Sequence, residues 1–119
     1  MPTNKEFGQQ LEKRTKAFSV RILKLVTLLP QARGVEVVVH QLVKSGTSIG
    51  ANYREANRGV SRADFRHKAS ICEKEASETQ YWLEIIVEAG WLSAEQVQPD
   101  LKECGELLAI FTSIGKSMK

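Results

Sequence analysis

The sequence has few residues that could cross-link the chain, interrupt its helices or hold it in a membrane. Its 119 residues include two cysteines and three prolines. It has no apolar run of the roughly 18 residues that a membrane-spanning helix needs. Its first residues, MPTNKEFGQQLEKR, also lack the apolar block of a signal peptide. We therefore expect a cytoplasmic protein.

The two cysteines stand apart, without the CxxC or Cys/His spacing that would indicate a zinc site. Two thiols also make a poor disulfide framework. Cys72 and Cys104 both fall on apolar helical stripes. We expect both to be reduced residues of the hydrophobic core.

Charge is unevenly distributed along the chain. The net charge is only +3, but residues 1–68 hold 13 Lys and Arg against 5 Asp and Glu, a net charge of +8. Residues 69–119 hold 4 basic against 9 acidic residues, a net charge of −5. This asymmetry indicates either ordinary solvated helix faces or an electropositive end that meets an anionic partner.

Apolar residues recur at spacings of three and four along most of the chain, which is the helical period. Pro30 stops the first periodic segment, Ser61 is typical of a helix N-cap, and Pro99 marks the start of the last helix. The predicted helices cover roughly residues 5–29, 34–57, 61–91 and 99–117. Short connections between them favour one all-α domain over residues 1–119, an antiparallel up-and-down four-helix bundle.

The segment VEVVVH, at residues 35–40, could be a strand if it were read alone. Its continuation indicates a helix instead, because a heptad seam runs through Val35, Val39, Leu42, Gly46 and Ile49.

The stretch SGTSIGANY, at residues 45–53, continues this seam with small residues around it. A phosphate-binding loop would need a Lys after the second glycine and a strand before it, and both are missing here. We interpret Gly46, Gly50 and Ala51 as positions where two helix backbones approach closely.

In an up-and-down bundle, the start of the first helix, the end of the second and the start of the third share one end. Basic residues would converge there and form a candidate nucleic-acid-binding surface. Its members are Lys13, Arg14, Lys16, Arg54, Arg58, Arg62, Arg66 and Lys68.

Glu55, Glu75 and Glu78 could form a polar cluster with Asn52 and Tyr53 if the second and third helices pair. Carboxylates inside a helical bundle can hold two metal ions, but ferritin-like sites also use a Glu-x-x-His motif. This chain lacks that motif. We interpret the cluster as a hydrogen-bonded structural network and expect neither a metal nor a cofactor.

No nucleophile in the sequence has a credible proton relay. Cys72 and His67 are five residues apart on the third predicted helix, and the serines fall at helix caps and packing positions. We expect no catalytic residues and no enzymatic activity.

A second set of apolar residues lies outside the main seams. Val20 and Leu23 on the first helix, and Trp82, Ile85 and Ala89 on the third, cannot all enter the single interior of a small bundle. Such patches mark partner surfaces. We expect these residues to form a homo-oligomer interface. Because two different helices carry them, a head-to-tail contact could close into a ring.

Two segments, QLVKSGTSIGANYREA and SRADFRHKASICEKEASETQYWLEII, resemble a known family. They are similar to bacterial four-helix-bundle proteins encoded by intervening sequences within large-subunit ribosomal RNA genes. Relatives of that family include the accessory variability determinant of diversity-generating retroelements. The resemblance implies a homopentameric ring without enzymatic activity. For the retroelement relatives it also implies binding to nucleic acid and to a reverse transcriptase.

The sequence thus favours a non-enzymatic oligomeric scaffold that binds RNA or DNA through its basic surface. The alternative is a protein–protein interaction module, for example a reverse-transcriptase accessory subunit, with no direct role in nucleic-acid binding. In that case the apolar patches would serve the partner and the charge would only maintain solubility.

Overall fold

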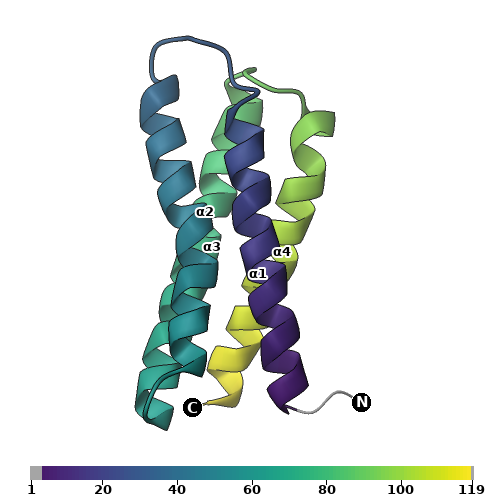
Figure 1. Cartoon of the computed structure of the whole chain (residues 1–119). Helices are drawn as coiled ribbons and strands as arrows, with labels where there is room; N and C mark the ends of the chain where they lie inside the picture. Colours follow the sequence, from purple (N-terminus) through teal and green to yellow (C-terminus); the bar gives the residue numbers. More distant parts are fainter. Residues whose placement is uncertain (1–3, 119) are drawn as a thin grey trace.

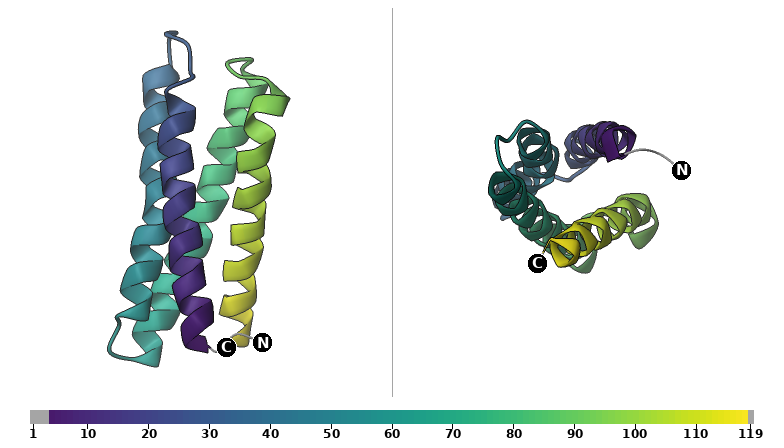
Figure 2. Two further views of the ribbon diagram at one scale, coloured as in Figure 1. Left: turned by 45° about the vertical axis from the view of Figure 1, so that its right-hand side comes forward. Right: turned by 90° about the horizontal axis from the view of Figure 1, so that it is seen from below.

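The computed structural model describes residues 4–118, which fold into four α-helices without a strand (Figure 1). Their bounds are α1 (Asn4–Val26), α2 (Val35–Asn57), α3 (Arg62–Glu88) and α4 (Ala94–Ser117). Successive helices run in opposite directions and lie side by side (Figure 2). The predicted all-α four-helix bundle is therefore confirmed.

The bundle is elongated, with extents of 45 × 26 × 21 Å. The start of α1, the α2–α3 turn and the end of α4 lie at the lower end in Figure 1, and the other two connections lie at the upper end. The three basic segments of the sequence therefore share one end, as the up-and-down topology requires.

Local sequence explains most helix ends. Ser61 caps α3 by accepting a hydrogen bond from the backbone N–H of Asp64. At the other end of α3, Gly90 has a φ of 76°, and the N–H of Trp91 donates to the carbonyl of Ile86. This left-handed glycine reverses the chain after α3 and satisfies carbonyls that the last helical turn would leave unpaired.

Three predicted boundaries were wrong. α3 ends at Glu88, three residues before the predicted end at residue 91. α1 ends at Val26, and residues 27–29 form a tighter turn in which each N–H bonds three residues back. α4 begins at Ala94 and contains Pro99, because the Ser93–Gln96 capping box fixes the helix start earlier. Pro99 costs the bond to the carbonyl of Glu95, but both residues are exposed, so water can hydrate that carbonyl.

The core is a continuous apolar column with a small polar layer. Tyr53 and Phe111 meet edge to face in it, with ring centroids 5.5 Å apart. Buried hydroxyl groups are satisfied within the bundle: Thr79 Oγ1 lies 2.9 Å from Ser45 Oγ and donates to the carbonyl of Glu75. Both cysteines are buried and reduced, as expected, and Cys72 contacts the carbonyl of Ile49.

α1 and α2 approach closely where α2 carries glycine. A Cβ added at Gly50 would lie 3.2 Å from the backbone carbon of Thr15, and one at Gly46 would lie 3.0 Å from Ile22 Cγ1. Ser19 Oγ also donates to the carbonyl of Gly46 across this contact. Ala51, predicted with the glycines, is exposed and does not take part, because one residue turns the helix by about 100°.

We predict opposite effects for two glycine substitutions. Gly105 lies inside α4 with its nearest neighbour, Gln80 Nε2, at 3.8 Å, so Gly105→Ala should stabilise the protein by about 0.5–1 kcal/mol through helix propensity. Gly50→Ala gains the same propensity but must push the α1 backbone away, so we expect a net loss of about 1 kcal/mol. Urea unfolding measures both; equal stabilisation by the two substitutions would contradict the close contact.

Candidate nucleic-acid interface

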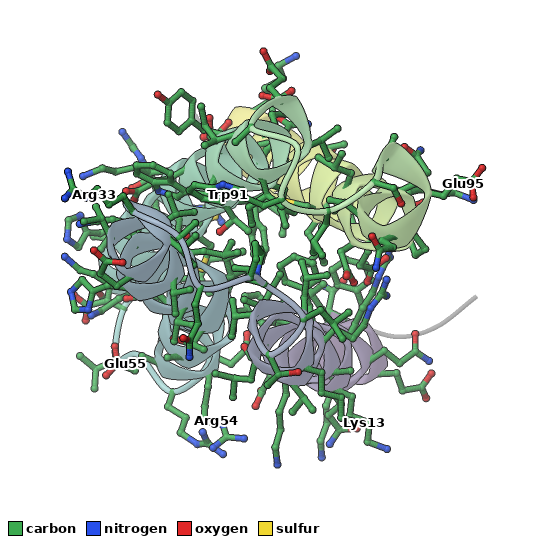
Figure 3. All side chains as sticks on the ribbon, turned by 90° about the horizontal axis from the view of Figure 1, so that it is seen from above. Lys13, Arg33, Arg54, Glu55, Trp91 and Glu95 are labelled. Carbon is green, nitrogen blue, oxygen red and sulfur yellow. The ribbon has the colours of Figure 1, made fainter. Side chains whose placement is uncertain are left out.

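Four of the predicted basic residues line one groove between α1 and α2. Lys13 and Lys16 come from α1, and Arg54 and Arg58 come from the end of α2. All four are exposed. Spacings of three and four place each pair on one side of its helix. Lys13 and Arg54 extend from the same side of the bundle (Figure 3). We call this set the basic groove.

The basic groove holds one carboxylate against its four cations. Glu12 accepts a hydrogen bond of 2.8 Å from Asn57, and its other oxygen lies 3.8 Å from Arg54 Nε. That separation is long, and the Arg54 side chain is half exposed, so the pair is weak. Within residues 4–118, Lys13, Lys16 and Arg58 form no salt bridge. The groove therefore keeps a strongly positive balance.

Arg14 was predicted to converge with these cations, but it does not line the basic groove. It turns toward α4, where Nε and Nη2 contact the two carboxylate oxygens of Glu103 at 2.7 Å each. Nη2 also lies 2.8 Å from Glu106. The hydrogen bond from Arg14 lowers the pKa of the Glu103 carboxyl, and the same contact raises the pKa of Arg14. Arg14 thus joins α1 to α4.

A second ion pair follows the same seam. Arg21 Nε lies 2.8 Å from Asp100, whose side chain is largely buried. Arg14 and Arg21 are seven residues apart, two helical turns, so both face α4. The α1–α4 contact therefore has a strong ionic component, whereas the α1–α2 contact rests on close packing.

The three residues of α3 that were predicted for the basic surface are placed separately from the groove. Lys68 Nζ lies 3.0 Å from Glu55 Oε2 and ties α3 to α2. Arg62 and Arg66 are exposed in the first turns of α3, at the same end of the bundle, and neither forms a salt bridge with a described residue. They extend the positive end beyond the groove.

The predicted oligomer surface is partly exposed. Val20 and Leu23 are 44% and 45% exposed and follow Lys16 along the outward side of α1. On α3, Trp82 and Ile85 are half-buried against the core, and Ala89 is exposed at the helix end. Sequence reasoning missed Tyr81, which is exposed and stacks edge to face on Trp82 with centroids 4.9 Å apart.

An apolar groove at the upper end was also missed. It is lined by Val26 at the end of α1, by Leu29 in the connection that follows, and by Val35, Val39 and Val43 from α2. The heptad seam placed Val39 inside, but Val38 is buried there instead. At about 100° per residue, Val38 lies closer than Val39 to the middle of the buried face of α2, which accounts for the difference. The valine-rich run VEVVVH, at residues 35–40, was the sequence feature that could have indicated this apolar groove.

The polar cluster expected around Glu55 does not form. Glu55 pairs with Lys68, Asn52 donates to the carbonyl of Ser48, and Tyr53 is buried in the core. Glu75 and Glu78 do lie near each other. Burial of the Glu75 carboxyl raises its pKa, and the negative charge of Glu78 raises it further. Across the described part of the chain, no three His, Cys, Asp or Glu side chains are grouped as metal ligands would be.

Burial also determines the state of the two thiols. It raises the pKa of Cys72 to about 12 and that of Cys104 to about 12, so both are protonated near neutral pH.

None of the helices in residues 4–118 combines the length and apolar character that a membrane span requires.

Fold and surface together define a small four-helix-bundle protein with a basic groove between its first two helices. The chain belongs to the 23S rRNA-intervening sequence protein family, whose model matches residues 9–113. This confirms the family that the sequence motifs indicated.

A solved structure supports the assignment. The 1.70 Å crystal structure of a protein of unknown function from the S23 ribosomal protein family, from Bacteroides thetaiotaomicron VPI-5482, is 39% identical to this chain. It superposes with a TM-score of 0.82 over 88% of this chain and 97% of that one. No curated protein matches the chain.

We predict that the Arg14–Glu103 pair contributes pH-dependent stability. Because the folded state lowers the pKa of Glu103, the contribution is present above the unfolded value of about 4.3 and is lost as pH falls through the folded value. Glu103→Gln should cost about 1 kcal/mol at pH 7, since solvent screens the partly exposed Arg14. The cost should be smaller at pH 3 than at pH 7, because protonation of Glu103 removes the charge that Arg14 contacts.

Urea unfolding at the two pH values measures this difference. Glu106→Gln is the matched control, because Glu106 is half exposed and shares only one hydrogen bond with Arg14. Its effect should be smaller. A cost for Glu103→Gln that is the same at pH 3 and pH 7 would contradict a charge-dependent tie.

Proposed function

We propose that the protein is a non-enzymatic oligomeric scaffold that binds RNA or DNA along the basic groove. The observation that carries the proposal is the meeting of Lys13, Lys16, Arg54 and Arg58 around a single carboxylate, Glu12. Three of these cations have no acidic partner among the described residues. They are available for phosphate groups.

The chemistry of the groove suits a nucleic-acid backbone. Lys and Arg neutralise phosphates and release condensed counterions, which supplies affinity without reading the base sequence. The arginine guanidinium also presents paired N–H groups that match phosphate oxygens. Arg62 and Arg66 would extend the contact along the same end of the bundle. The groove residues therefore favour backbone recognition over base recognition.

Self-association would repeat this groove. Val20 and Leu23 expose apolar surface on α1, and the Trp82–Tyr81 pair offers an aromatic surface on α3. A contact between two unlike surfaces is head to tail and closes into a ring when its rotation permits. The family resemblance implies five copies. Linked grooves would bind one long nucleic acid more tightly than a single groove does.

The buried thiols support a non-enzymatic role. Cys72 and Cys104 are protonated, packed in the core and hydrogen-bonded to backbone carbonyls of Ile49 and Ala76. They cannot meet a substrate without unfolding. His67 is exposed, and the buried Cys72 thiol is directed at the Ile49 carbonyl, so the two residues make no nucleophile–base pair.

A second candidate function rests on the apolar groove. Valine side chains of α2 and the end of α1 present a surface that fits an apolar helix of a partner protein. The protein would then act as an accessory subunit, for example of a reverse transcriptase, as the resemblance implies. Recovery of one partner protein after nuclease treatment, without any RNA affinity of the purified protein, would favour this candidate.

We predict that RNA binding depends steeply on salt and on the basic groove. The double substitution Lys16→Glu with Arg58→Glu should weaken binding to a structured RNA at least tenfold at about 100 mM salt. It should also lower the slope of log Kd against log salt concentration by about two, because each lost phosphate contact removes close to one unit. Fluorescence anisotropy at several salt concentrations measures both quantities.

The matched control is Arg33→Glu with Lys102→Glu. It changes the net charge by the same amount, but Arg33 lies in the α1–α2 connection at the upper end and Lys102 lies on α4. This variant should keep most of the affinity. Equal losses in the two double variants would show that only net charge matters and would reject the groove.

We also predict that Leu23→Glu dissociates the oligomer. Wild-type protein should sediment as a multiple of 13.3 kDa, and the variant should sediment near 13.3 kDa, because the new carboxylate would be buried without a partner. Gln10→Glu adds the same charge to an exposed position of α1 and should leave the mass unchanged. A wild-type mass of 13.3 kDa at micromolar concentration would reject the oligomer.

A further inference from the structure

The α2–α3 turn carries the most exposed large apolar side chain of the described residues. Val60 is 95% exposed. It belongs to the turn that connects α2 to α3 at the lower end of the bundle (Figure 1). Arg58 and Arg62 flank it two residues away on each side, and Arg66 follows one helical turn later. All three arginines are exposed. We call residues 58–62 the arginine–valine tip.

The structure holds this tip in place from both sides. Before Val60, the N–H groups of Arg58 and Gly59 donate to the carbonyls of Glu55 and Ala56 at 3.1 and 3.2 Å. After it, Ser61 caps α3 through the N–H of Asp64.

Gly59 also fits tightly against the start of α3. A Cβ at this position would lie 3.2 Å from Asp64 Cβ, so a larger residue would disturb the turn. Val60 is therefore presented to solvent on an ordered turn.

Folding does not account for a valine at this position. The side chain is almost as exposed as it would be in an unfolded chain, so it gains no burial when the bundle forms. An apolar side chain surrounded by cations instead suits a partner that is anionic on its outside and apolar within. A nucleic acid has this construction, with phosphates outside and stacked bases inside.

The tip is joined directly to the basic groove. Arg58 lines the groove, and Val60 follows two residues later, so their Cα atoms are at most about 7 Å apart. A strand whose phosphates lie along the groove would therefore bring its bases within reach of Val60.

We propose that the arginine–valine tip inserts Val60 between bases of RNA at a point where base stacking is already interrupted, such as a bulge. Arg58 and Arg62 would hold the phosphates on either side. Apolar side chains that wedge between bases are known from proteins that bend nucleic acids. The proposal rests on the proposed function, because the basic groove supplies most of the affinity.

The small size of the Val60 side chain determines which RNA it can enter. One isopropyl group gains less by burial than separating two well-stacked base pairs costs, so insertion into an uninterrupted duplex is unfavourable. At a bulge the stacking is already weakened, and the cost is smaller. A single valine is also a weak membrane anchor, since stable anchoring takes a far larger apolar area. RNA with an interrupted helix is therefore the favoured ligand.

Two hairpin RNAs of equal length test the proposal, one fully paired and one with a two-nucleotide bulge flanked by 2-aminopurine. Wild-type protein should bind the bulged RNA about tenfold more tightly and raise the 2-aminopurine fluorescence as the base unstacks. Val60→Ser should lose both effects while its affinity for the paired RNA changes less than about twofold. It should fold like the wild type, because Val60 is not packed.

Val37→Ser is the matched control, since Val37 is also exposed but lies in the first turn of α2 at the opposite end. It should behave like wild type. An unchanged bulge preference in Val60→Ser would overturn the wedge while leaving the basic groove intact. Failure of the wild type to bind either RNA at low salt would instead reject the proposed function itself. Vesicles containing phosphatidylglycerol complete the test: Val60-dependent binding to them, without a bulge preference, would reassign the tip to membranes.

Discussion

The close approach of α1 and α2 is the contact on which the rest of the molecule depends. Gly50 lets the α2 backbone come against the backbone of Thr15, and Gly46 accommodates the side chain of Ile22. Lys16 is the next residue after Thr15, and Arg54 lies one helical turn beyond Gly50. The packing contact and the basic groove are therefore neighbours: glycines that cost helix propensity bring two rows of cations to one side of the bundle.

The other seam of α1 uses a different kind of contact. Arg14 and Arg21 form ion pairs with carboxylates of α4. These two cations therefore stabilise the bundle and are not free to bind a ligand. The cations of α1 thus divide by direction, because Lys13 and Lys16 point outward and toward α2. Lys13 and Arg14 are adjacent in the sequence. The helix turns by about 100° per residue, so the two side chains face different neighbours.

Much of the fold was predictable from the sequence. Apolar spacings of three and four identify the helices and place Phe18, Ile22, Ile49 and Cys72 on their inward faces. Ser61 locates the start of α3, whereas the start of α4 was wrongly placed at Pro99 although Ser93 and Gln96 supplied a cap. The role of Arg14 was not predictable, because a residue at the edge of a seam can turn to either neighbouring helix. That choice depends on Glu103, 89 residues further along the chain.

The candidate site was predictable only in part. Eight cations were expected to converge, but the pairings with Glu55 and α4 carboxylates remove Lys68 and Arg14 from the set. Such pairings depend on three-dimensional neighbours that composition does not contain. The arginine–valine tip was also invisible to periodicity, because a turn residue belongs to no helical stripe and its exposure is known only from the fold.

Lysine acetylation footprinting, with and without a structured RNA, tests the central claim most directly. The claim is that the groove between α1 and α2 is where nucleic acid lies. RNA should protect Lys13 and Lys16 strongly and leave Lys102, on the exposed side of α4, at its free rate. Strong protection of Lys102 with unchanged reactivity at Lys13 and Lys16 would contradict the account.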